Sequence, residues 1–292
     1  MGPLDALPRL QVGDAFTSVV EWIEGNLPWL LDTIKTVLKW AVNQLDTGLT
    51  YIPVLVTILA LAAIGWYLRS WAFGVYTLGG FVLIANMEMW DESMSSLALV
   101  IVASVCAMGI AVPLGVVGAR SHNVSRIIRP LMDMMQTMPA FVYLIPTLFF
   151  FSIGVVSGVV ATVVFAIPPG VRLTELGLRQ VDGEMLEAGQ AFGASPWQVL
   201  SRIQIPLALP TIMAGVNQVI MLSLSMVVIA GMVGAGGLGG VVYEGVTRLN
   251  LSKGFEGGLA VVILAIYLDR LTGALADRAP VARALRVRST AE

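Results

Sequence analysis

MSSLALVIVASVCAMGIAVPLGVVG, residues 94–118, is a run of 25 residues without a single charged side chain. A helix needs about 20 apolar residues to cross the roughly 30 Å hydrocarbon layer of a membrane, so this run predicts a transmembrane helix. The whole chain has the same character, because 57% of its 292 residues are hydrophobic, 12% are charged, and the mean hydropathy is +0.84. This composition excludes an ordinary soluble domain, which needs a polar shell.

Further apolar segments surround this run, and we predict about seven transmembrane helices in all. The other six segments cover residues 51–68, 71–86, 131–151, 153–168, 208–234 and 257–276. Segments 71–86 and 153–168 are short for a bilayer. The predicted fold class is therefore an all-α, polytopic membrane helix bundle.

The basic residues indicate the orientation of these helices, because cytoplasmic loops carry an excess of Lys and Arg. If the C-terminus is cytoplasmic, twelve of the 17 basic residues lie inside and five lie outside. Seven helices then place the N-terminus outside. The formal net charge of -2 argues against nucleic acid as a partner, since phosphate binding needs clustered basic residues.

The segment before the first predicted span has an amphipathic pattern. Apolar residues recur every three or four positions over 31–45, while Asp32, Lys35 and Lys39 fall on another face. We expect a helix on the outer membrane surface, preceded by an unanchored tail over residues 1–20. The alternative is an eighth, poorly hydrophobic span, in which these charges would lie near the middle of the bilayer at high cost.

The polar stretch 170–206 is the only long insertion on the cytoplasmic side. Asp182 is suited to cap a first short helix over about 183–192, and Gly193 supplies the left-handed residue that often follows a helix end. Ser195, Pro196 and Gln198 have the spacing of a capping box at the start of a second short helix. Pro206 is expected to stop that second helix.

The same stretch contains a recognisable motif. Glu187, Ala188, Gly189, Phe192 and Gly193, followed after nine residues by Ile203 and by Pro206, resemble the cytoplasmic signature of ABC importer permeases, E-A-A-x3-G-x9-I-x-L-P. Gly189 replaces the second alanine of the signature, and Ile205 replaces its leucine. Residues 136–144, 192–196, 210–218, 224–230 and 236–239 also look similar to permeases for glycine betaine, proline betaine and choline.

This resemblance, which covers about 94–276, implies a type I importer core made of the last five spans. The expected parts are an extracytoplasmic tail and interfacial helix (1–50), two accessory spans (51–93), the permease domain with its ATPase-coupling loop (94–276, loop 170–206) and a cytoplasmic tail (277–292). It further implies a bacterial inner-membrane complex with a second copy of the permease, two ABC ATPase subunits and an external substrate-binding protein.

The chemistry of the chain agrees with a transport role without catalysis. It has no G-x4-G-K-[ST] phosphate loop, so ATP and Mg are expected in the partner ATPase and no cofactor in this chain. Gly234 to Gly239 match G-x-G-x-x-G, but the match follows a membrane span and no βαβ unit surrounds it. We expect a flexible or tightly packed turn there.

Residues of the sixth predicted span are candidates for the translocation path. Gln218, Leu222 and Ser225 share one helix face. The alternative is that their polar groups make hydrogen bonds between helices. Pro139 and Pro146 are expected to kink the fourth span.

Two other classes of membrane protein need different residues. An ion-coupled secondary transporter normally has carboxylates or histidines inside the membrane, and here Asp133 and Asp269 both lie near span ends. An intramembrane enzyme needs a nucleophile with a base, or a metal cluster, and the chain has one cysteine, Cys106, and one histidine, His122.

Overall fold

The computed structural model describes residues 12–278, and within this range the chain is helical and contains no strand. Two parts of the predicted tails lie outside the described residues: residues 1–11 of the N-terminal tail and residues 279–292 of the C-terminal tail. The helices are α1 (Val12–Asn26), α2 (Pro28–Tyr51), α3 (Val54–Leu68), α4 (Trp71–Asn86), α5 (Trp90–Arg120), α6 (His122–Thr137), α7 (Leu144–Phe151), α8 (Val155–Arg179), α9 (Gly183–Ala191), α10 (Pro196–Val199), α11 (Ile205–Met232), α12 (Gly237–Thr247) and α13 (Leu251–Asp277). A 3₁₀ turn (Ala140–Tyr143) precedes α7, and a π-helical turn (Leu200–Gln204) joins α10 to α11.

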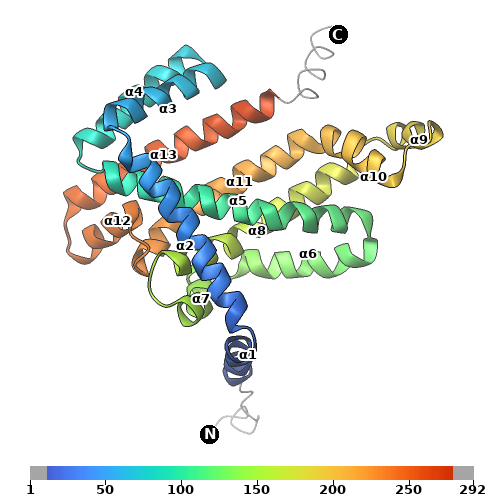
Figure 1. Cartoon of the computed structure of the whole chain (residues 1–292), viewed down its shortest axis with the longest axis horizontal. Helices are drawn as coiled ribbons and strands as arrows, with labels where there is room; N and C mark the ends of the chain where they lie inside the picture. The colour runs from blue at the N-terminus through green and yellow to red at the C-terminus, as the bar shows by residue number, and fades with distance from the viewer. Residues whose placement is uncertain (1–11, 279–292) are drawn as a thin grey trace, which may run out of the picture.

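The centre of the fold consists of α5, α8, α11 and α13, which run along the long axis of the molecule (Figure 1). Within residues 12–278, four helical stretches are long and apolar enough to cross a membrane: Trp90–Arg120, Val155–Arg179, Pro196–Met232 and Leu251–Asp277. The number rises to six if each of two bent pairs, α2 with α3 and α6 with α7, is one span. The predicted all-α membrane bundle is confirmed. Each predicted span overlaps a helix, but 51–68 and 131–151 contain breaks, and α4, over 71–86, is shorter than the four long stretches.

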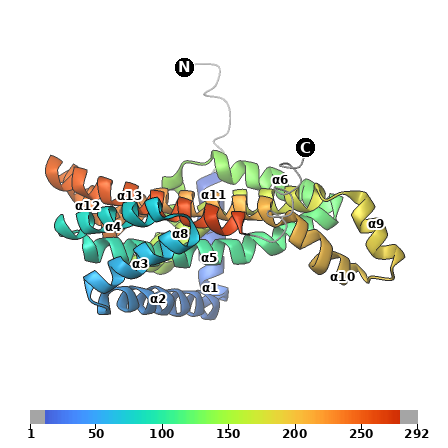
Figure 2. The same cartoon turned by 90° about the horizontal axis from the view of Figure 1, so that it is seen from above.

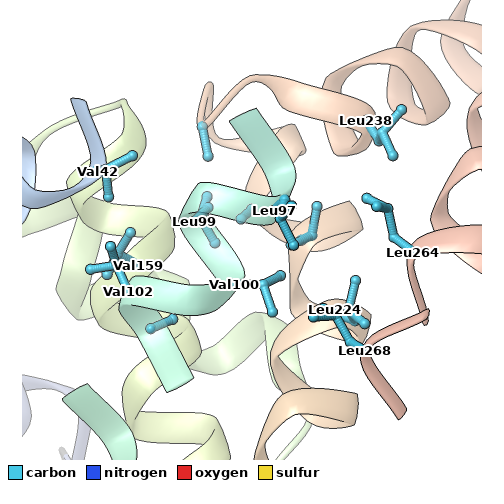
Figure 3. Close-up of a cluster of buried hydrophobic side chains, with 14 of the residues drawn as sticks. Val42, Leu97, Leu99, Val100, Val102, Val159, Leu224, Leu238, Leu264 and Leu268 are labelled. Carbon is cyan, nitrogen blue, oxygen red and sulfur yellow. The ribbon is translucent and has the colours of Figure 1, made fainter. Parts of the chain in front are cut away.

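The central helices approach one another closely at small residues. Such close packing favours their association, because the hydrophobic effect does not drive helices together in lipid. A Cβ on Gly115 of α5 would lie 2.6 Å from Thr174 Cβ of α8, and one on Gly170 would lie 2.7 Å from Ala111 Cβ. Around these contacts a continuous apolar core joins the four helices. Figure 3 shows part of it, with Val159 of α8 on one side of α5 and Leu224 of α11 and Leu264 of α13 on the other.

The fourth predicted span, 131–151, is broken in the structure. Its two halves, α6 and α7, meet at an angle of 109°. Pro139 is the cause, because a proline disfavours helical geometry in the residue before it. Met138 accordingly has an extended backbone with ψ of 134°. The structure therefore has a sharp bend of 109° where the sequence predicted a kink.

The fifth predicted span, 153–168, is longer than expected. Helix α8 continues through Pro168 and Pro169 to Arg179, so residues 170–179 belong to it and not to the polar loop. Their charges made this end look solvated in the sequence. In the structure, Glu175 is buried and paired with two arginines, which allows the helix to continue inside the bundle.

Helix α2 packs along one side of the bundle, as Figure 2 shows. Its apolar stripe faces α5 and α8, with Leu38 and Val42 buried, and Ser95 of α5 donates a 2.7 Å hydrogen bond to Asp46. The stripe that was expected to face a membrane surface thus faces protein, because the bundle offers it a complementary apolar side. Residues 12–20 form part of helix α1, in which residues 13–19 are exposed and Val20 is buried. The position of α2 relative to the bilayer stays a prediction.

Helices α3 and α4 form a hairpin that docks on α13. The ring of Tyr267 lies edge-on to Phe81 at 5.2 Å and stacks on Phe73 at 6.0 Å. At the turn of the hairpin, Arg69 forms a 3.4 Å ion pair with Asp277. An aromatic cluster and a surface ion pair thus attach the two accessory helices to the last helix of the core.

The glycine-rich turn after α11 is tightly packed, as one of the two sequence interpretations expected. Gly234, Gly236 and Gly237 all have positive φ, between 60° and 77°. After this turn α12 folds back so closely on α11 that a Cβ on Gly239 would lie 2.0 Å from the carbonyl oxygen of Val227. A Cβ on Gly231 would meet the backbone of Gly239 at 2.1 Å. Only glycine fits at this crossing.

Candidate functional site

Residues 183–199, which we call the polar hairpin, project beyond one end of the bundle (Figures 1 and 2). The predicted caps are confirmed. The Asp182 carboxylate accepts a 3.0 Å hydrogen bond from the Glu184 amide at the start of α9. Ser195 and Gln198 form a complete capping box at the start of α10. Gly193 joins the helices with a φ of +80°, the left-handed conformation that the sequence predicts.

The signature residues divide between two faces of the polar hairpin. Glu187, Ala188 and Phe192 point to solvent, and the Phe192 side chain is 93% exposed. Trp197 on α10 is 67% exposed on the same hairpin. Two large aromatic side chains are thus exposed on a polar projection.

Gly193 is exposed at the turn, whereas Gly189, Ile203 and Pro206 are half-buried toward the bundle. A Cβ on Gly189 would lie 2.5 Å from Cδ1 of Ile203, so the absence of a side chain at 189 lets the π-helical turn pack on α9. The Gly189 departure from the signature therefore has a packing reason. Pro206 does not stop the second helix, which contradicts the sequence expectation. It lies in the first turn of α11, where a missing amide hydrogen costs little.

The polar hairpin is attached to the bundle at several points besides the chain itself. Arg120, the last residue of α5, donates a 3.0 Å hydrogen bond to the carbonyl oxygen of Pro196. Leu200 is buried in an apolar cluster with Leu178, Ala208 and Ile212. Between these attachments lies a cavity of about 190 Å³. The hairpin and the residue that follows it therefore contact α5, α8 and α11.

Charged residues on α6 and α8 form an ion-pair network that the sequence analysis did not identify. Glu175 accepts from Ser125 and Arg129 of α6 at 2.7 and 2.8 Å and pairs with Arg179 at 2.9 Å. Asp133 pairs with Arg172. The available signal was the spacing of three or four residues on both segments, but that signal requires knowing that residues 170–179 are helical.

On α11, Gln218 and Ser225 are exposed in the single chain and Leu222 is half-buried. The Ser225 hydroxyl donates to the Met221 carbonyl of its own helix at 3.0 Å. Bonds between helices come from the neighbouring residues instead. Asn217 donates to Asp269 at 2.9 Å, and Ser104 donates to Ser223 at 3.2 Å. Within residues 12–278, the face of α11 that carries Gln218, Leu222 and Ser225 thus makes no side-chain hydrogen bond to another helix.

The residues that other classes of protein would need are engaged in structural contacts. Asp133 is paired with Arg172, and Asp269 accepts from Asn217. Over residues 12–278, no group of His, Cys, Asp and Glu side chains lies close enough to hold a metal ion.

Comparison with protein families places residues 111–279 in the family described as binding-protein-dependent transport system inner membrane component. The chain is 46% identical to the glycine betaine transport system permease protein OpuAB of Bacillus subtilis, over 92% of this chain and 95% of that protein. It is 45% identical to the glycine betaine/proline betaine permease ProW of Escherichia coli, over 89% of this chain and 73% of that protein. It is 52% identical to the glycine betaine/carnitine permease GbuB of Listeria monocytogenes, over 72% of this chain and 75% of that protein.

Among solved structures, the fold is similar to a chain of the inward-facing MetNI methionine ABC transporter. The TM-score is 0.60 at 22% identity, over 64% of this chain and 94% of that chain. A second crystal form of that transporter gives a TM-score of 0.58 at 23% identity, over 62% of this chain and 91% of that chain. This likeness concerns the fold alone.

Proposed function

Because this chain belongs to the family of binding-protein-dependent transport system inner membrane components, we propose that it carries glycine betaine or a related quaternary ammonium solute across the membrane. It is a multi-pass inner-membrane permease of an ABC importer, and such a permease works with an ATPase and a substrate-binding protein. Three relatives at 45–52% identity are named for glycine betaine, which supports this substrate class. Proline betaine, choline and carnitine belong to the same class.

The observation that carries the coupling role is the polar hairpin, which presents Glu187, Ala188 and Phe192 on a projecting face. This face is the proposed docking site for the ATPase. Gly189, Gly193, Ile203 and Pro206 hold the face in position. The chain has no phosphate loop, which supports binding of ATP and Mg by the partner and no catalytic site or cofactor here.

The working complex in this proposal has two copies of the permease, two ATPase subunits and one external binding protein. The exposed face of α11, with Gln218, Leu222 and Ser225, faces the path between the two permeases. An external binding protein selects the solute, and aromatic side chains around the quaternary ammonium would supply cation–π attraction.

The proposal predicts ATP-dependent uptake of glycine betaine by the complete complex. The permease, its ATPase and its binding protein are reconstituted in liposomes, and uptake of labelled glycine betaine is measured with ATP on the ATPase side. Proline betaine, choline and carnitine are tested as competitors. Uptake that needs an ion gradient and proceeds without ATP would instead support the alternative, an ion-coupled secondary transporter.

The proposal also predicts an outside N-terminus and a cytoplasmic C-terminus, based on the twelve-to-five distribution of basic residues. Reporter fusions after Asn86 and after Glu292 are expected to report opposite sides of the membrane. Finding both fusions on one side would contradict the arrangement of seven spans.

A further inference from the structure

Helices α6 and α8 are joined by a row of charged and polar side chains near the end of the bundle that bears the polar hairpin. We call the set the charge row, and its members are Ser125, Arg129 and Asp133 on α6 and Arg172, Glu175 and Arg179 on α8. The three α6 residues recur every fourth position, so they lie on one helix face. The two helices are antiparallel, which brings successive turns of α6 against successive turns of α8.

Glu175 is the centre of the charge row. Its side chain is 4% exposed, and its Oε1 atom receives the hydroxyl of Ser125 at 2.7 Å and the guanidinium of Arg129 at 2.8 Å. Arg179 binds the same oxygen at 2.9 Å and also donates to the carbonyl oxygen of Gly118 at 2.9 Å. Three helices, α5, α6 and α8, therefore meet at one carboxylate.

Helix α6 also packs on α5, and Ile128 and Met135 are half-buried against the apolar core. Its buried residues are Ser125 and Met132, while Ile127, Leu131 and Met134 are exposed. The charge row supplies the hydrogen bonds and ion pairs that join α6 to α8. Stability alone is a poor explanation. A buried carboxylate such as Glu175 is often no more stabilising than an apolar residue of similar size, and the exposed pair of Asp133 and Arg172 adds little net stability.

The charge row lies where the polar hairpin joins the membrane helices. Arg179 is the last residue of α8, and α9 begins at Gly183. Beyond the other end of α6, the chain turns by 109° into α7, whose Leu144 and Phe151 are buried where α7 contacts α8. Movement of α6 relative to α8 would therefore change the position of α7.

We propose that the charge row makes α6 follow α8, so that a displacement of the polar hairpin reaches α6 and the bent segment α7. Asp133, Arg172 and Glu175 are then positioning residues of the transport cycle. This inference rests on the proposed coupling role of the polar hairpin.

A charge swap tests the pairing of Asp133 with Arg172. In the reconstituted importer, Asp133→Arg and Arg172→Asp are each expected to lower the ratio of substrate-stimulated to basal ATP hydrolysis at least about tenfold, and the double variant is expected to return it to within about threefold of wild type. Arg126→Asp is the matched control, because Arg126 lies on the same helix, is exposed and has no ion pair in the described chain. It is expected to keep the wild-type ratio.

Hydrogen exchange provides a second measurement that does not depend on transport. In Asp133→Arg, the amides of α6 are expected to exchange at least about tenfold faster while those of α5 and α8 keep their protection. If a single variant accumulates poorly, Glu175→Gln, which keeps the side-chain shape, is measured in its place with the same two expectations.

Wild-type stimulation in both single variants, or no recovery in the double variant, would overturn the proposal. Unchanged exchange of α6 would overturn it as well. If the wild-type complex itself shows no ATP-dependent uptake, the proposed function fails, and the exchange experiment still decides whether the charge row holds α6.

Discussion

Replacing Gly239 with alanine is expected to prevent accumulation of the folded permease. The added Cβ would lie 2.0 Å from the carbonyl oxygen and 2.8 Å from the carbonyl carbon of Val227. Both are backbone atoms inside α11, so no side-chain rotation relieves the overlap. Overpacking in a core typically costs about 1–3 kcal/mol, and a backbone overlap of this size should exceed about 3 kcal/mol. Fluorescence-detected gel filtration of detergent extracts measures the loss.

The neighbouring residue provides the control. A Cβ on Gly240 has no atom within 4 Å, so Gly240→Ala is expected to give the wild-type yield and melting temperature. If Gly239→Ala also gives a monodisperse protein of wild-type melting temperature, α11 and α12 do not cross as closely as described.

Replacing Gly193 with valine is expected to abolish transport while the protein still accumulates in the membrane. Gly193 has a φ of +80°, and a β-branched residue there costs on the order of 1–2 kcal/mol. That energy is enough to change the angle between α9 and α10 but too small to unfold the membrane bundle, whose packing does not include this exposed residue. Uptake and substrate-stimulated ATP hydrolysis of the reconstituted complex are the measurements.

Gly193→Asn is the matched variant, since asparagine tolerates the left-handed conformation better than other residues with a side chain. It should retain most of the transport activity. Space does not limit either variant, because no atom lies within 4 Å of a Cβ at this position. Full stimulation of ATP hydrolysis in Gly193→Val would mean that the backbone conformation at this turn does not matter for coupling.

The polar hairpin could be predicted almost residue by residue because its ends depend on local chemistry. Asp182, Ser195 and Gln198 satisfy amides within three residues of themselves, and Gly193 acts through its own backbone. Such signals can be recognised in the sequence without knowing which distant residues are in contact. The general fold class was equally accessible, because long uncharged runs such as 94–118 leave few alternatives to a membrane helix.

The structure differs from the sequence predictions where contacts between residues far apart in the sequence decide the conformation. The charges at 172–179 looked solvated in the sequence, but α6 supplies counter-charges that let α8 continue. Pro206 was expected to end a helix, yet the π-helical turn before it joins α10 to α11 without a break in the helical stretch Pro196–Met232. The apolar stripe of α2 could not reveal whether it faces lipid or protein, since both are apolar.

The docking of α3 and α4 on α13 has a consequence for biogenesis. The ribosome delivers helices in chain order, and Tyr267 and Asp277, which receive the early hairpin, are near the end of the translated chain. Until the last core helix arrives, the hairpin therefore lacks these contacts and packs on α5 instead, through pairs such as Phe81 and Trp90. Its turn-side ion pair and aromatic contacts with α13 would then form only after synthesis is almost complete, so that attachment of the accessory helices to α13 is a late step in assembly.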